Sequence, residues 1–228
     1  MRLPSLRALA IVSTVGLAVA AASAFGSRAQ STIAPALSSP DVRPTASGTL
    51  DTAVFAGGCF WGIEGVFEHI KGVESATSGF AGGKTRSPSY EEVSSGATGH
   101  AESVEVVYDE SQVSYGQLLR VFFSVHDPTQ LDRQGPDEGT QYRSAVFYRT
   151  PQQRRVTEAY VAQLRASGHY KAPIVTEVSA LDAFFPAEGY HQHYMQLHPT
   201  APYIVINDAP KMALLKRAFP RLYRDAWR

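Results

Sequence analysis

Apolar and polar residues alternate along the chain in patterns that predict strands and helices from about residue 51 onward. The apolar run over 52–56 predicts a short buried strand, which Gly57-Gly58 ends. Residues 59–70 then carry apolar side chains at helical spacing, which predicts an amphipathic helix that is over by Gly72. The remaining pattern predicts strands at 73–80, 102–108, 144–149, 173–179 and 202–206, and helices at 114–123, 151–168 and 208–218.

Polar residues mark the helix starts and the loops between these elements. Ser114 and Thr150 are suited to cap the helices that follow them, and Pro151 fits a first helical position. We predict loops at 82–99 and 127–142, and the second is long enough to suggest a functional role. Strands and helices mix without strict alternation, so we predict an α+β fold.

The composition limits the partners and sites of this 228-residue chain. It has 11 Tyr and 11 Phe, enough to build a sizeable core. Lys and Arg number 21, as do Asp and Glu, so the basic composition typical of nucleic-acid binding is missing. The single cysteine, Cys59, excludes a disulfide within one chain and a zinc site built from several cysteines.

The first 50 residues differ from the rest. Arg2 and Arg7 precede a long uncharged apolar run that ends in Ala22-Ser23-Ala24, a small-x-small cleavage pattern. These features predict a signal peptide over 1–24 and an exported protein, in the periplasm. The run is also long enough to stay uncleaved as a membrane anchor. Residues 25–50 are rich in small residues and proline, which predicts a flexible linker with no packed structure, before a folded domain at 51–228.

Cys59 stands between a strand with two glycines and the start of a helix. A helix N-terminus favours an anion, so we expect the pKa of this thiol to be lowered. Gly57 and Gly58 would let a ligand approach the backbone closely. The alternative is a buried cysteine that acts as a small hydrophobic residue.

The segment Gly58–Gly62, GCFWG, resembles the signature of the type A peptide methionine sulfoxide reductases. The resemblance covers about residues 52–218 and implies a two-layer α+β sandwich around a mixed sheet, with a ferredoxin-like core. Six further blocks of this sequence agree with the family in order: Gly79–Gly83, Tyr90–Val93, Gly99–Glu102, His126–Thr129, Gly139–Ser144 and Pro186–Gln192.

The resemblance implies reduction of methionine S-sulfoxide, in proteins and free, to methionine. Cys59 matches the family nucleophile, whose thiolate attacks the sulfoxide sulfur. Glu102 matches the carboxyl group that protonates the sulfoxide oxygen. To donate at neutral pH its pKa must be raised, as burial beside apolar rings would do.

Five further residues match family positions around the substrate. Tyr90 and Tyr142 match tyrosines that donate hydrogen bonds to the sulfoxide oxygen. Asp137 matches an aspartate that helps to place the substrate or a water molecule. Phe60 and Trp61 match the hydrophobic pocket for the substrate's methyl group.

The chain departs from the family in its recycling. Many members carry further cysteines near the C-terminus, and one of these would fall at Ile204 of Pro202-Tyr203-Ile204. Without it, attack should leave Cys59 as a sulfenic acid. We expect an external thiol, such as a thioredoxin-like dithiol, to reduce that acid, and no bound cofactor. The residues around Ile204 are expected only to pack.

The histidines near the C-terminus raise the question of a metal. His191 and His193 have a spacing that suits metal ligands, and His198 lies near them. The block matches a structural segment of a metal-free family, so we expect no metal and leave the roles of these histidines open. His100 is expected to be structural.

Two other functions are compatible with a lone cysteine at a helix start. One is a cysteine hydrolase with a histidine base, although the blocks surround Cys59 with a carboxylate. The other is a binding module that senses oxidised methionine without turnover. We favour the reductase, and expect it to be a monomer.

Overall fold

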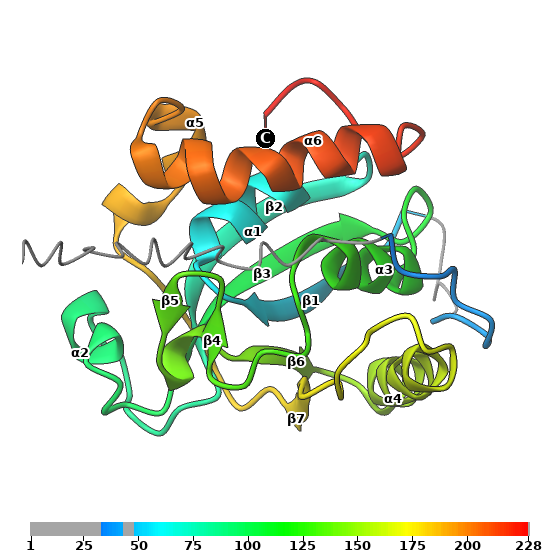
Figure 1. Ribbon diagram of the computed structural model, residues 1–228, viewed down its shortest axis with the longest axis horizontal. Coiled ribbons are helices and arrows are strands. Elements are labelled where there is room, and N and C mark those ends of the chain that lie inside the picture. Colours follow the sequence, from blue (N-terminus) through cyan, green and yellow to red (C-terminus); the bar gives the residue numbers. More distant parts are fainter. Residues whose placement is uncertain (1–32, 43–47, 228) are drawn as a thin grey trace, which may run out of the picture.

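A six-stranded mixed sheet, in the order β7-β6-β1-β3-β2-β8, forms the centre of the computed structural model, which describes residues 33–42 and 48–227 (Figure 1). The strands are β1 (Leu50–Gly57), β2 (Val73–Ala81), β3 (Ala101–Asp109), β4 (Arg133–Gln134), β5 (Asp137–Glu138), β6 (Ser144–Tyr148), β7 (Glu177–Ala180) and β8 (Phe184–Pro186), of which β4 and β5 form a separate hairpin. The helices are α1 (Phe60–Glu68), α2 (Tyr90–Ser94), α3 (Tyr115–Val125), α4 (Pro151–Ala166), α5 (Tyr194–Leu197) and α6 (Ala209–Ala218).

The strand directions make the sheet mixed. β1 is antiparallel to β3 and β6, and β2 is antiparallel to β3 and β8, whereas β6 and β7 are parallel. The predicted α+β fold with a mixed sheet is therefore confirmed. That its core is a ferredoxin-like two-layer sandwich stays a prediction.

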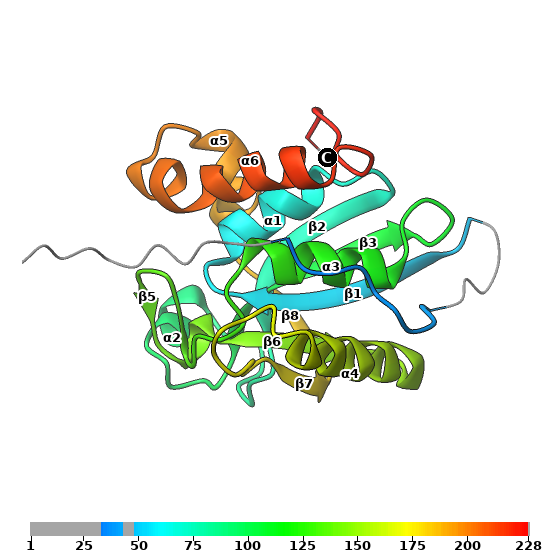
Figure 2. The ribbon, with the colours of Figure 1, turned by 45° about the vertical axis from the view of Figure 1, so that its right-hand side comes forward.

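The main hydrophobic core lies between one face of the sheet and the helices α1, α3 and α4. Because side chains alternate along a strand, Phe55 of β1 points to this face while Val54 points to the other. Phe55 stacks on Phe67 of α1 and on Phe122 of α3, with ring centroids 5.1 and 5.0 Å apart. Figure 2 shows α6 lying along α1, on the outside of this layer.

The predicted flexible linker at 25–50 is wrong for residues 33–42, which pack against α3 and α4. Ala34 is fully buried, and its N–H donates to Ser124 Oγ at 2.9 Å. Tyr160 Oη donates to the carbonyl of Pro35 at 2.6 Å. Small residues and proline fit closely between helices, so a composition typical of linkers forms a packed strap here. The predicted signal peptide lies outside the described residues.

The predicted strand at 202–206 is also wrong. Ile204–Asp208 forms a π-helical turn that continues into α6. Ile204 is 1% exposed whereas Val205 and Ile206 are 52% and 58% exposed, so burial does not alternate as in a strand. The predicted loops at 82–99 and 127–142 contain α2 and the β4–β5 hairpin respectively.

Among the described residues, no helix is both long enough and apolar enough to cross a membrane.

Candidate active site

Four of the predicted site residues come together because of the strand directions. The C-terminal ends of β1 and β2 lie at the same end of the sheet as the N-terminal ends of their antiparallel neighbours β3 and β6. Cys59 follows the end of β1, and Tyr90 lies in the segment after β2. Glu102 is the second residue of β3, and Tyr142 comes just before β6. Residues up to 83 positions apart in sequence therefore share one end of the sheet.

The turn into α1 places Cys59 as the helix N-cap residue. The preceding Gly58 has φ +90°, and a Cβ there would lie 2.5 Å from the side chain of Gln134, so both the conformation and the packing require glycine. The N–H of Phe60, free at the start of the helix, donates to Glu102 Oε2 at 3.0 Å. The carboxyl group is thereby held at the helix end that carries the cysteine.

Glu102 is 2% exposed, and its environment favours the protonated form. Burial, with a smaller contribution from Asp137, raises the pKa of Glu102 from 4.5 to about 8, although the hydrogen bond from Phe60 acts in the opposite direction. The sequence analysis predicts the same upward shift in the pKa of Glu102. At neutral pH the group can therefore donate a proton.

The expected lowering of the Cys59 pKa is wrong. The thiol is 7% exposed, and burial raises its pKa well above the ordinary value, as do the carboxylates of Glu102 and Asp208. A hydrogen bond from the N–H of Trp61 and the charge of Lys211 act in the opposite direction. Burial outweighs the helix end because the thiolate would lose its water.

Lys211 and Asp208 belong to the surroundings of Cys59, and sequence reasoning missed them. Their side chains form an ion pair with Lys211 Nζ 2.8 Å from Asp208 Oδ1, both largely buried. The pair lies over the first turn of α1, where a Cβ at Gly62 would be 2.0 Å from Asp208 Oδ1. Only the spacing of the two residues, three apart at a helix start, could have drawn attention to them.

An aromatic wall forms beside Cys59. The ring of Phe60, 1% exposed, lies 5.1 Å from His191 and 6.5 Å from Tyr90. Trp61 stacks on Tyr194 at 3.8 Å, and its Nε1–H donates to His191 Nδ1 at 3.2 Å. The predicted pocket residues Phe60 and Trp61 are thus neighbours with rings 6.4 Å apart.

Tyr90 and Tyr142 both lie close enough to Glu102 and Cys59 to be affected by their charges. Charges on Glu102 and Cys59 add to burial in raising the pKa of both tyrosines, that of Tyr90 to about 12. Both phenols therefore keep their protons at neutral pH and remain hydrogen-bond donors.

Asp137 on β5 accepts a hydrogen bond from Tyr203 Oη, and burial raises the pKa of its carboxyl group. Tyr203 also meets Trp61 edge-on, with ring centroids 5.8 Å apart. The expectation that residues around Ile204 only pack is therefore wrong for this tyrosine. Tyr203 stands directly before the helical turn at Ile204–Asp208, and its contacts with Asp137 and Trp61 place it at the site.

The histidines have structural partners. His100 accepts from the N–H of Gly83 at Nδ1, 3.1 Å away, while its Nε2 lies 2.7 Å from the carbonyl of Thr85, so both ring nitrogens are engaged with the backbone. His191 is 2% exposed and bonds Trp61, and His198 packs on Tyr194.

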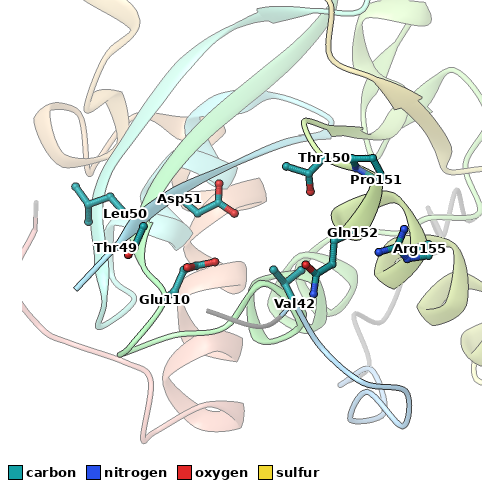
Figure 3. Close-up of a pocket in the computed structure, with 9 residues that line it drawn as sticks. All are labelled: Val42, Thr49, Leu50, Asp51, Glu110, Thr150, Pro151, Gln152 and Arg155. Atoms are coloured by element: carbon teal, nitrogen blue, oxygen red, sulfur yellow. The ribbon is translucent and has the colours of Figure 1, made fainter. Parts of the chain in front are cut away.

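A pocket elsewhere on the surface is lined by none of the predicted site residues (Figure 3). Leu50 and Asp51 at the start of β1 belong to it, whereas Cys59 follows the other end of this strand, roughly 25 Å away. The other residues that line it are Val42, Thr49, Glu110, Thr150, Pro151, Gln152 and Arg155.

Comparisons with known proteins agree on one family. The family model described as peptide methionine sulfoxide reductase matches residues 51–222. A peptide methionine sulfoxide reductase MsrA 2 of Mesorhizobium japonicum is 56% identical over 77% of this chain and 90% of its own length. That of Synechocystis is 49% identical over 92% and 97% respectively. Methionine sulfoxide reductase A of Corynebacterium diphtheriae, a solved structure, has a TM-score of 0.61 and 39% identity, covering 69% of this chain and 78% of that one.

Proposed function

Because this chain belongs to the type A peptide methionine sulfoxide reductase family, we propose that it reduces the S epimer of methionine sulfoxide with Cys59 as its nucleophile. Family membership itself makes the chain an oxidoreductase that acts on methionine sulfoxide. The finer proposal concerns the epimer, the residues and the fate of the cysteine. Its substrates are both oxidised proteins and the free amino acid.

In the first step the Cys59 sulfur bonds to the sulfoxide sulfur and the S–O bond breaks. The oxygen leaves as water, with one proton from Glu102 and one from the thiol itself. Tyr90 and Tyr142 donate hydrogen bonds to the oxygen while charge develops on it. Phe60 and Trp61 surround the methyl group, and Asp137 positions the substrate.

Water then attacks the Cys59 sulfur, which expels methionine and returns a proton to Glu102. The sulfoxide has gained two electrons, and Cys59 has lost two and become a sulfenic acid. An external thiol condenses with this acid, releases water and forms a mixed disulfide. A second thiol resolves the disulfide and restores Cys59, so a dithiol of the thioredoxin type should be more efficient than a monothiol.

One observation carries the proposal: the N–H of Phe60, the residue next to the only cysteine of the chain, holds the buried carboxyl group of Glu102, whose pKa is raised to about 8. A buried acid that keeps its proton at neutral pH is the donor that sulfoxide reduction needs.

The test is a stoichiometry measurement. Reduced protein is mixed with excess S-sulfoxide of a blocked methionine, without added thiol. We expect one methionine per chain, a Cys59 adduct with a dimedone-type probe, and no reaction with the R-sulfoxide. The Cys59→Ser variant should release none. Two or more methionines per chain without reductant, or turnover by the serine variant, would contradict the proposed mechanism.

A further inference from the structure

Two glutamates of α1, Glu64 and Glu68, lie one helical turn apart and face a histidine of the segment before α5. Each glutamate is 1% exposed. His193 Nδ1 lies 2.5 Å from Glu68 Oε1, and the N–H of His193 donates to Glu64 Oε2 at 3.1 Å. One oxygen from each carboxyl group and one ring nitrogen of His193 all lie within 4.8 Å of one another.

The two carboxyl groups have fewer partners than their burial requires. Within the described part of the chain, Glu68 Oε2 is buried and makes no hydrogen bond, and Glu64 Oε1 has at most the buried hydroxyl of Ser78 as a partner. The charge of Arg224, which donates hydrogen bonds to the backbone carbonyls of Glu68 and Val73, favours the ionised form of Glu68. Burying a carboxylate without partners is costly unless a proton or a cation compensates it.

We propose that Glu64, Glu68 and His193 bind a divalent transition-metal ion of the zinc class. Two carboxylates and a neutral imidazole balance the charge of such an ion, and these are ligands that zinc accepts. The His193 side chain is 45% exposed, so water can reach the fourth position of a tetrahedral site. Calcium and magnesium fit less well, because they require more oxygen ligands.

The ion would join α1 to the segment that forms the aromatic wall. His193 lies between His191, which accepts from Trp61 Nε1, and Tyr194, which stacks on Trp61. The metal would thus fix both partners of Trp61 without touching Cys59. Its role is structural and lies beyond the proposed reaction.

This inference departs from the expectation of no metal. That expectation considered only the three histidines close together in sequence. The two carboxylate ligands proposed here, Glu64 and Glu68, are 129 and 125 positions away from His193 in the sequence and contact it only in the folded chain.

The test measures metal binding in a form that cannot bind through the thiol. Cys59→Ser protein, dialysed against a chelator, is titrated with Zn²⁺ by calorimetry and with Co²⁺ by visible absorption. We expect one ion per chain, a tetrahedral Co²⁺ spectrum and a higher melting temperature. Loss of a ligand should weaken binding at least about tenfold.

Glu68→Gln and His193→Ala are the ligand variants, and His198→Ala is the control for a histidine outside the cluster. The first two should lose binding and the control should retain it. His193 is partly exposed, so its variant can decide the question even if Glu68→Gln fails to fold. Absence of micromolar Zn²⁺ binding, or equal binding by the His193→Ala variant, would overturn the proposal.

Discussion

The charges around Cys59 partly cancel. The pKa of Glu102 is about 8, so at neutral pH most of this group is protonated and only a small part of its charge opposes a thiolate. Asp208 does oppose it, but Lys211 neutralises Asp208 in an ion pair of 2.8 Å. The resting thiol is held neutral mainly by burial, and its ionisation depends on these few side chains.

We expect Glu102→Gln to slow methionine release in a single turnover by about 10²–10⁴-fold, because the amide has no transferable proton. The wild-type rate should also fall as the pH rises through about 8, where Glu102 loses its proton, and the variant should lack this decline. Rapid-quench measurements between pH 6 and 9 test both points. Glu105→Gln, on the same strand, is the control. A decrease of less than about threefold would point to another proton donor.

We expect Lys211→Met to raise the pKa of Cys59 further, because the charge that favours the thiolate is lost. Alkylation of Cys59 by iodoacetamide at a fixed pH should slow by about tenfold for each unit of increase. Lys216→Met removes an exposed lysine of the same helix and should leave the rate unchanged. Equal alkylation rates for the two variants would show that Lys211 does not lower the pKa of Cys59.

Local sequence patterns were sufficient to predict those helices whose spacing of apolar residues or capping residues lie within the helix or directly before it. The periodicity of α1, the capping residue Ser114 of α3 and the Thr150–Pro151 start of α4 all correspond to the structure. The run from Tyr203 to Ile206 has strand-forming residues but folds as a helix, since only Ile204 finds a buried position.

The candidate site residues also fall into those that the sequence could indicate and those that it could not. Cys59 and Glu102 could be found because each stands in a recognisable block. Lys211 and Asp208 could not, because their proximity to Cys59 depends on how α6 packs across α1. Contacts between distant segments leave no periodic trace in a single sequence.

The strap formed by residues 33–42 provides a test at this scale. Ser124→Ala removes the hydroxyl group that accepts from the N–H of Ala34 and leaves that N–H buried without a partner. We expect a loss of about 1–3 kcal/mol in the free energy of unfolding, measured with urea. Ser38→Ala removes an exposed hydroxyl of the same strap and should cost less than about 0.5 kcal/mol. Equal stability of the two variants would mean that the hydrogen bond between Ala34 and Ser124 does not contribute to folding.

For the whole molecule, the acid at the centre of the site is a source of instability at neutral pH. Folding raises the pKa of Glu102 from 4.5 to about 8. Its contribution to stability is therefore fully present below pH 4.5, where both states are protonated, and is lost progressively as the pH rises to about 8.

We accordingly expect Glu102→Gln to melt at a higher temperature than the wild type at pH 8, and the difference to shrink towards pH 5. Subtracting the two curves removes the contributions of other groups, such as the buried His126, whose pKa of about 4 gives the opposite slope. Melting curves of the wild type, Glu102→Gln and the control Glu105→Gln across this range test the expectation. A difference that does not change with pH would show that Glu102 is not protonated in the folded state.

The stacking of Trp61 on Tyr194 also gives the molecule an optical reporter. The chain has only two tryptophans, and the other, Trp227, lies edge-on to His69 far along the sequence. Indole emission shifts in colour with the polarity around the ring, and a nearby imidazole quenches it when protonated. In a Trp227→Phe background, the fluorescence of Trp61 would follow the arrival of a substrate methyl group in real time, without an attached dye.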